Sequence, residues 1–209
     1  MKTSEYFNFE RKRPRIEPAP EEIIGVKGPI MELAPSGSYR IEDFDIYDEL
    51  KSGPLIEVAG PTEDGFDFVD IEKLPGKIFV SNLYPGTPRF KTGNMIGYYG
   101  LVDFRGDGRS LPVKEGSVGA IFLSCLGRTR GKDGESETEK YRLNKELREN
   151  VMEEAYKVLK PGGILVFEKT KREDFEFATR LGFELKQYKV KKFFNTDSWS
   201  FVFQKQKKH

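Results

Sequence analysis

The sequence predicts an α/β fold, with a mainly parallel seven-stranded sheet, helices on both faces and a C-terminal antiparallel hairpin. Three observations lead to this fold class. From Leu55 onward, short apolar runs alternate with Gly and Pro turns, which is typical of strands buried on both faces. One long segment between two such runs has the apolar period of a helix. The last two apolar runs are separated by a short polar loop, Asn195-Thr196-Asp197.

The strands are predicted from apolar runs that are bounded by turn residues. Because helical segments separate them, the first five are expected to be parallel. Their ranges are 55–59, 77–83, 100–104, 119–126 and 164–168. The hairpin is expected to consist of 183–194 and 198–205, joined through the short loop.

The clearest helix begins at the capping box Ser136–Glu139 and ends at Val158. Its apolar residues recur every three or four positions, so one face is expected to be buried: Leu143, Leu147, Val151, Ala155 and Val158. A second helix is expected to begin where Thr170 and Glu173 form a cap, and to stop at Gly182. Shorter helices are expected over 41–50 and 64–74.

The first 50 residues differ in composition from the rest of the chain. They are charged and contain five prolines that interrupt any long helix: Pro14, Pro18, Pro20, Pro29 and Pro35. We expect residues 1–50 to form an N-terminal arm that lies against the domain, and residues 51–209 to form the domain itself.

Charge and composition restrict the function classes. The chain has 209 residues and a formal net charge of +1, so no overall field favours nucleic acid or an acidic membrane. Its single cysteine, Cys125, excludes an intramolecular disulfide, and its single histidine, His209, is the last residue. No apolar run is long enough to span a membrane. We therefore expect a cytoplasmic protein with no metal site and no membrane partner.

Three stretches resemble the class I S-adenosylmethionine-dependent methyltransferases. They are LIEVAGPTEDG at 55–65, LVDFRGDGRSLPVKEGSVGAIFLSCL at 101–126 and EEAYKVLKPGGILVFEK at 153–169. The last is the most specific, because in that family a helix that ends in such a "VLKPGG" turn leads directly into the fifth strand. The resemblance covers about 55 to 205 and implies S-adenosylmethionine as the cofactor.

The resemblance implies cofactor contacts at the carboxyl ends of the strands, where ligands bind in open parallel sheets. The candidate cofactor-binding residues are Glu57, Ala59, Gly60, Asn82, Asp107 and Ser124. At Gly60 the missing side chain lets a ligand approach closely. Glu57 is expected either to hold the turn or to accept from the amino group of the ligand, and Asp107 to accept from the adenine amino group.

Two departures from the family pattern leave alternatives open. Ala59 stands where the family has its first glycine, and Pro61 provides no N–H to a ligand. An acid that binds ribose is expected at the end of the second strand, where this sequence has Asn82. If the second strand were 66–71 instead, the acid would be Asp70 or Glu72.

Other motifs favour ordinary structure over chemistry. Cys125 and Ser124 lie in an apolar strand without a histidine to activate them, and the loop 127–135 is Gly-rich and basic, as solvated loops often are. The lysines and aromatic residues after Lys186 fit a hairpin with aromatic residues inside and lysines outside.

These features together favour methyl transfer from S-adenosylmethionine to an unidentified acceptor, with a small molecule favoured over nucleic acid, and they assign no catalytic residue. The alternative is a catalytically inactive binding or scaffolding protein with the same fold. An NAD-linked oxidoreductase is less favoured, because the Gly-x-Gly-x-x-Gly fingerprint is absent.

Overall fold

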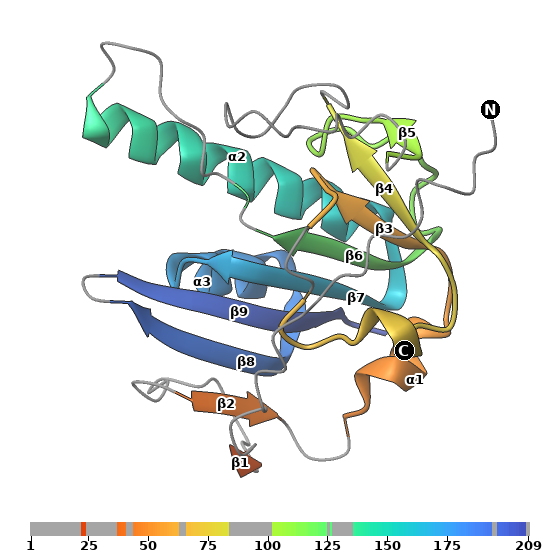
Figure 1. Ribbon diagram of the computed structural model, residues 1–209. Helices are drawn as coiled ribbons and strands as arrows, with labels where there is room; N and C mark the ends of the chain where they lie inside the picture. The colour runs from red at the N-terminus through yellow and green to blue at the C-terminus, as the bar shows by residue number, and fades with distance from the viewer. Residues whose placement is uncertain are drawn as a thin grey trace, which may run out of the picture.

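A single nine-stranded sheet forms the centre of the molecule (Figure 1). The computed structural model describes residues 22–23, 37–40, 44–62, 66–83, 102–124, 126, 136–193 and 196–207. The strand order is β1-β2-β8-β9-β7-β6-β3-β4-β5. The strands are β1 Glu22–Ile23, β2 Gly37–Arg40, β3 Leu55–Val58, β4 Ile78–Asn82, β5 Phe104–Arg105, β6 Val118–Ser124, β7 Leu159–Thr170, β8 Phe183–Phe193 and β9 Thr196–Lys205.

The sheet confirms the expected fold class. Strands β3 to β7 pair in parallel, and β9 is antiparallel to both β7 and β8. The chain runs outward from β3 through β4 to β5 and then returns to place β6 on the other side of β3. This reversal next to β3 is the point of the sheet at which ligands bind in open α/β folds.

Two strands were not expected from the sequence. β2 pairs antiparallel with β8, with Gly37 opposite Val190 and Arg40 opposite Gln187, and β1 pairs with β2. The segment before residue 50 therefore extends the sheet beyond its C-terminal hairpin. The proposed boundary between an arm and a domain at residue 50 stays a prediction.

Some strand boundaries differ from the expected ones. The third strand was expected at 100–104, but β5 is Phe104–Arg105, and residues 100–101 lie outside the described part of the chain. The fifth strand is longer than expected, because β7 already begins at Leu159, directly after the helix, and includes the Pro-Gly-Gly turn sequence. A register shift between Val118 and Ala120 accommodates these extra residues.

The long helix forms as expected, and the next helix begins in a different way. α2 spans Glu137–Val158, and Ser136 caps it by accepting from the backbone N–H of Glu139 at 3.2 Å. α3 spans Glu173–Leu181, but its N-cap residue is Arg172, which makes no side-chain cap. The expected cap by Thr170 is wrong: its hydroxyl bonds Asp174 instead.

The connection between β3 and β4 contains far less helix than expected over 64–74. Among the described residues of this connection only Ile71–Lys73 is helical, as the short 3-10 helix η2, which Asp70 caps by accepting from the backbone N–H of Glu72 at 3.1 Å. Residues 63–65 lie outside the described part of the chain. Before β3, α1 is limited to Ile46–Leu50 and is capped by Asp45.

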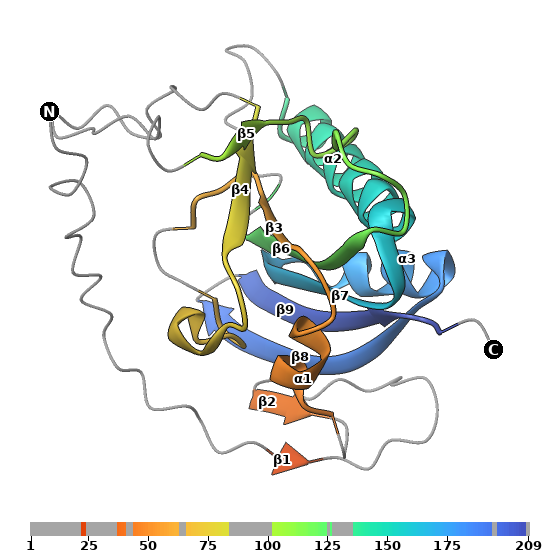
Figure 2. The same cartoon turned by 90° about the vertical axis from the view of Figure 1, so that its right-hand side faces the viewer.

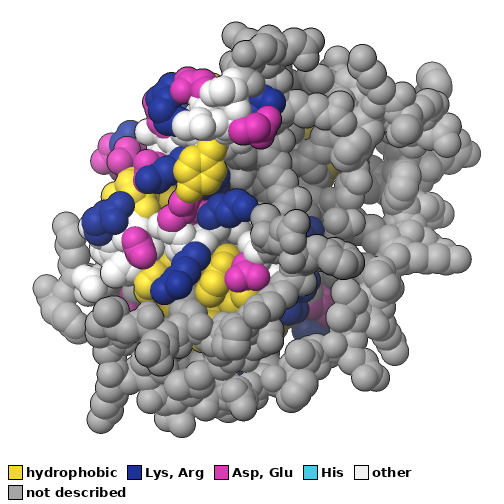
Figure 3. All heavy atoms as spheres, turned by 90° about the vertical axis from the view of Figure 1, so that its left-hand side faces the viewer, with side chains coloured by type: hydrophobic (Ala, Val, Ile, Leu, Met, Phe, Trp, Pro, Cys, Tyr) yellow, Lys and Arg dark blue, Asp and Glu magenta, His cyan; other side chains and the backbone are white. Residues whose placement is uncertain are grey.

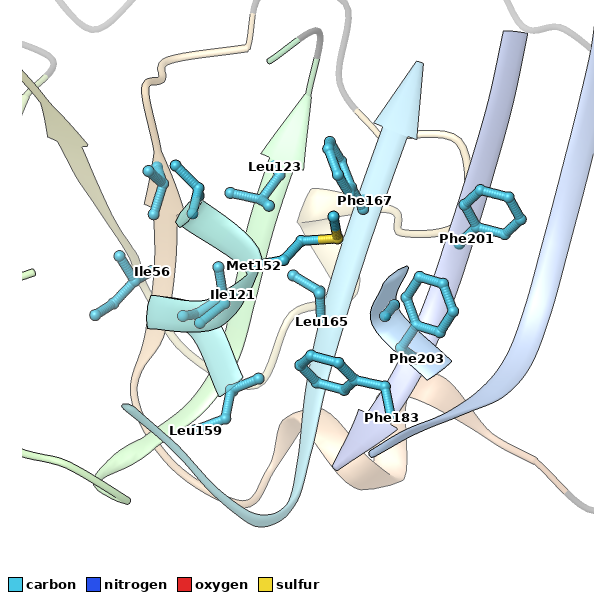
Figure 4. Close-up of a cluster of buried hydrophobic side chains, with 14 of the residues drawn as sticks. Ile56, Ile121, Leu123, Met152, Leu159, Leu165, Phe167, Phe183, Phe201 and Phe203 are labelled. Atoms are coloured by element: carbon cyan, nitrogen blue, oxygen red, sulfur yellow. The ribbon is translucent and has the colours of Figure 1, made fainter. Parts of the chain in front are cut away.

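The core has one layer on each face of the sheet. α2 and α3 cover one face, and η2 lies on the other (Figure 2). Met152 of α2 packs among the side chains of β6 and β7, including Leu165 and Phe167 (Figure 4). On the opposite face Phe122 and Val166 pack with α1 and with residues that precede η2. The longer helices are thus confined to one face, and short segments close the other.

Candidate functional site

β3 ends in a bend that places several polar groups at the carboxyl edge of the sheet. Ala59 has a φ of 60°, a left-handed conformation that non-glycine residues rarely adopt. The backbone N–H of Gly60 donates to the carbonyl of Ser81 on β4 at 3.2 Å. The bend is therefore fixed against the neighbouring strand, and Ala59 is held in a strained conformation at the position where the sequence predicted a cofactor contact.

Glu57 holds this bend from inside. Its side chain is buried, and its Oε1 accepts from the backbone N–H of Thr62 at 2.5 Å. A Cβ atom on Gly60 would lie 2.4 Å from Cδ of Glu57. Of the two roles that the sequence left open for Glu57, the structure shows the turn-holding one, and Gly60 is needed because the Glu57 carboxylate occupies the space of a side chain.

Asn82 stands at the end of β4, which confirms the preferred position of the second strand. The alternative strand over 66–71 is wrong, and Asp70 caps η2 instead. The side-chain amide of Asn82 donates to the carbonyl oxygen of Gly60 at 2.6 Å. Asn82 thus stabilises the bend. Its side-chain amide, which stands where the resemblance places a ribose-binding acid, is bonded to the chain itself.

The turn at Asp107 lies next to the same bend. The backbone N–H of Gly106 donates to the carbonyl of Asn82 at 3.3 Å, and a Cβ atom on Gly108 would lie 2.6 Å from Val58. On the far side of the turn, the backbone N–H of Leu111 donates to Oε1 of Glu154 at 2.9 Å. The turn is therefore fixed between β3 and α2.

The carboxylate of Asp107 is paired with a neighbouring arginine. Its Oδ2 accepts from the Arg109 guanidinium at 2.6 Å, and its Oδ1 accepts from the Arg109 backbone N–H at 3.0 Å. The hydrogen bond from Arg109 lowers the pKa of Asp107 below its usual value. The side chains of Asp107 and Arg109 are 32% and 51% exposed, so this ion pair opens at little cost.

Ser124 lies at the same edge, one strand further along, at the end of β6. It pairs in register with Glu168 on β7, and both side chains are buried. Oε1 of Glu168 accepts from the backbone N–H groups of Asp67 and Phe68 at 2.5 and 3.2 Å. Burial, and then the nearby Asp67 carboxylate, raise the pKa of Glu168 to about 8.

The sequence analysis did not identify Glu168. One signal was available, because Glu168 is the only charged residue in the run Ile164–Glu168 and stands near the carboxyl end of that strand. Its partner Asp67 could not be identified, since the two residues are a hundred positions apart. The Asp67 carboxylate accepts from Lys191 at 2.5 Å and from Ser200 at 3.1 Å.

The structure brings together most of the predicted site residues. Glu57, Gly60 and Asn82 belong to one bonded cluster with the Ala59 bend, and the Asp107 turn packs against it. Ser124 lies beside Glu168 at the same edge. Cys125 and the loop 127–135 lie outside the described residues.

The face at this edge carries charges of both signs. The parallel strands end on the left-hand side of Figure 1, and on the described surface in Figure 3 lysines and arginines alternate with aspartates and glutamates. In the described ranges, no three His, Cys, Asp or Glu side chains gather as metal ligands. Within those ranges no helix has both the length and the apolar character needed to cross a membrane.

No protein-family model matches the chain, and no curated protein sequence matches it. Solved structures do match. A SAM-dependent methyltransferase from Methanosarcina mazei is 12% identical, with a TM-score of 0.46, over 74% of this chain and 93% of that chain. One from Thermotoga maritima, proposed to methylate histamine, is 15% identical, with a TM-score of 0.45, over 76% of this chain and 88% of that chain.

A proposed DNA modification methylase from Thermus thermophilus is 18% identical, with a TM-score of 0.39. The match covers 50% of this chain and 53% of that chain, so it spans about half of the methylase. The strand order of the present chain provides the firmer evidence, because it combines a parallel core, a reversal next to β3 and an antiparallel β9 between β7 and β8. The chain therefore has a class I methyltransferase-like fold.

Proposed function

We propose that the protein binds S-adenosylmethionine at the carboxyl edge of β3 and transfers its methyl group to an acceptor. One observation carries this proposal: the Ala59 bend and the Asp107 turn, which are distant in sequence, pack against each other beside the reversal of strand order. That is the position at which open α/β sheets bind nucleotide-like ligands.

The residues fit the cofactor unequally. Asp107 fits an adenine amino group, because its partner Arg109 is exposed and its ion pair exchanges readily. Glu57 and Asn82 serve the bend itself, through Thr62 and Gly60. They act by shaping the loop that the cofactor would contact. When bound, the cofactor would supply an electrophilic methyl group, and Ser124 at the end of β6 would border the acceptor.

Positioning is the main contribution that the protein needs to make. Methyl transfer requires the acceptor to be held in line with the methyl group, and an aligned pair of reactants gains most of the rate enhancement from orientation. The fold does not select the acceptor. A small-molecule acceptor and a cytoplasmic location therefore stay predictions.

Calorimetric titration with S-adenosylmethionine tests the proposal. We expect micromolar binding by the wild-type chain and a loss of at least about tenfold in Asp107→Ala, which removes one charge-assisted hydrogen bond. The matched variant is Arg109→Ala, which removes the guanidinium partner of Asp107, keeps the backbone N–H of residue 109, and should bind as tightly as the wild type or more tightly. Equal affinity of all three chains would remove Asp107 from the site.

A second candidate function has its own support. Thr62 N–H, the Asn82 amide and the Asp107 carboxylate all bond groups of the chain itself. A fold whose site groups are paired internally is what a catalytically inactive binding or scaffolding protein would have. No heat of binding at millimolar S-adenosylmethionine would favour this candidate over the methyltransferase.

A further inference from the structure

Glu168 is the polar group at the carboxyl edge whose bonding is incomplete. Its side chain is 0% exposed, and Oε1 accepts two backbone N–H groups, whereas Oε2 has no hydrogen-bond partner. Among the described residues, the only other buried side-chain oxygen without a partner is Ser52 Oγ. Buried polar atoms are normally satisfied, so an unpaired carboxyl oxygen points to a missing partner.

The position of Glu168 connects it to the proposed site. Side chains alternate along a strand, so Glu168 and Ser124 point to the same face as Val166 and Phe122, at the ends of adjacent parallel strands. The next residue, Lys169, has a φ of 55°. Ala59 and Lys169 are the only non-glycine residues of the described chain with a positive φ, and both lie at this edge. Strain of this kind concentrates at functional sites.

We propose that Glu168 Oε2 takes up the proton that the methyl acceptor loses during transfer, which makes the acceptor a neutral group bearing N–H, O–H or S–H. This inference rests on the proposed function. The acceptor atom forms its bond to the methyl carbon with its own electron pair. The carbon–sulfur bond breaks, and its electron pair stays on sulfur. The proton leaves the acceptor and binds the Glu168 carboxylate.

Charge balance supports this assignment. The step converts a positive sulfonium and a negative carboxylate into neutral products, and a buried site of low dielectric favours such a neutralisation. An acceptor that is already anionic would need no base and would be repelled by Glu168. The same attraction works before transfer: a cationic cofactor close to Glu168 stabilises its ionised form.

The groups around Glu168 determine its resting charge. Asp67, from the β3–β4 connection, disfavours ionisation, and Lys169 on β7 favours it. From β8, Lys189 and Lys191 are engaged with Asp67 at 3.5 and 2.5 Å. With a pKa of about 8, roughly nine in ten copies carry the proton at pH 7. Binding of a cation next to Glu168 should therefore expel this proton.

Proton release on cofactor binding tests the inference without knowledge of the acceptor. Titrations in buffers of different ionisation enthalpy count the protons released by S-adenosylmethionine and by S-adenosylhomocysteine, which differ by the charged methyl sulfonium. For the wild-type chain at pH 7, we expect the number of protons released on binding of S-adenosylmethionine to exceed the number released on binding of S-adenosylhomocysteine by about half a proton or more. Glu168→Gln should abolish this difference.

Glu184→Gln is the control. This carboxyl lies at the start of β8, at the end of the sheet opposite to the carboxyl ends of the parallel strands, so the variant should leave the difference intact. The wild-type chain alone provides a second measurement. As the pH increases towards 8, Glu168 ionises more readily, so the affinity for S-adenosylmethionine should rise by up to about tenfold for each pH unit, and the affinity for S-adenosylhomocysteine should not.

Binding of both ligands with equal proton release in the wild-type chain would overturn the role of Glu168 and leave the proposed function standing. A difference that persists in Glu168→Gln would do the same. Failure of both ligands to bind would instead overturn the proposed function, and the inference with it.

Discussion

At the residue scale, the bend after β3 depends on the absence of one side chain. A Cβ on Gly60 would meet Cδ and Oε1 of Glu57 at 2.4 and 2.5 Å, so Gly60→Ala must displace the carboxylate that binds Thr62 N–H. We expect a loss of about 1–3 kcal/mol in the free energy of unfolding. Urea denaturation measures it. Gly76→Ala is the matched control, because a Cβ there would meet nothing within 4 Å.

Glu168 gives the chain a pH dependence of stability that is unusual for a carboxyl group. Because its folded pKa, about 8, lies above the ordinary value of 4.5, the folded protein binds the proton more tightly than the unfolded chain. Stability from Glu168 is thus present at pH 4.5 and is lost as the pH rises to 8, with a slope of at most about 1.4 kcal/mol per unit.

Glu168→Gln should therefore match the wild type near pH 5 and exceed it in unfolding free energy at pH 8. Denaturation curves at both pH values measure the difference, and a constant offset between the two chains would contradict the prediction. Asp67 and Asp107 do not interfere in this window. Despite the burial of Asp67, the ion pairs of both residues lower their pKa below 3.8, so their contributions are lost only in more acidic solution.

The residue scale also shows how far the sequence could predict the site. Gly60, Asn82 and Asp107 could be placed at one edge because each follows an apolar run, and parallel strands end together. Their bonding could not be predicted. The contacts of Glu57 with Thr62 and of Asn82 with Gly60 depend on side-chain directions at a tight bend, which residue spacing does not determine.

At the element scale, α2 and α3 are joined by a buried ion pair. Arg148 on α2 donates from Nε to Asp174 on α3 at 2.9 Å and from Nη2 to Glu173 at 2.6 Å. Both side chains of the Arg148–Asp174 pair are almost fully buried, with 4% and 1% exposure. Removal of the arginine alone leaves the Asp174 carboxylate without its cation in the protein interior.

We therefore expect Arg148→Ala to lower the free energy of unfolding by about 3–5 kcal/mol. Arg142→Ala provides the comparison on the same helix. Arg142 pairs with Glu139 and Glu146 at the exposed surface, where water screens the charges, so its removal should cost much less than that of Arg148. Chemical denaturation of both variants measures the two costs. Equal costs would show that burial of the pair has no energetic effect.

The helices were predicted with unequal success for a physical reason. α2 has a long apolar period and a Ser136 cap, so local signals and packing agree. The segment 64–74 has mixed apolar spacing, and tertiary contacts decide its structure: Glu168 and Tyr47 accept the backbone N–H groups of Asp67 and Asp70. Hydrogen bonds to these distant side chains replace the backbone hydrogen bonds of a helix. They cannot be predicted from the sequence of the segment alone.

At the scale of the whole molecule, the sequence predicted the seven strands of the fold but not the two that extend it. Apart from the two-residue β5, the strands from β3 to β9 are long or strongly apolar, whereas β2 is the sequence GSYR, which has no strand pattern of its own. The position of β2 depends on its antiparallel backbone pairing with residues 187–190 of β8. An edge strand presents unpaired backbone groups, so a short polar segment can pair there without an apolar signal.

Removal of residues 1–40 should therefore uncover the edge of β8 without disturbing the parallel core. The pairing lost is that of Gly37–Arg40 with residues 187–190, and the lysines at 189 and 191 on this edge disfavour pairing with another chain. We expect the backbone amides of residues 187–190 to exchange hydrogen faster in the truncated chain, and the amides of β7, two strands further in from β8, to keep their protection. Hydrogen exchange followed by mass spectrometry measures both regions in one experiment. Loss of protection in β7 as well would mean that the arm is part of the cooperative folding unit, and unchanged exchange at 187–190 would mean that β2 does not protect the edge in solution.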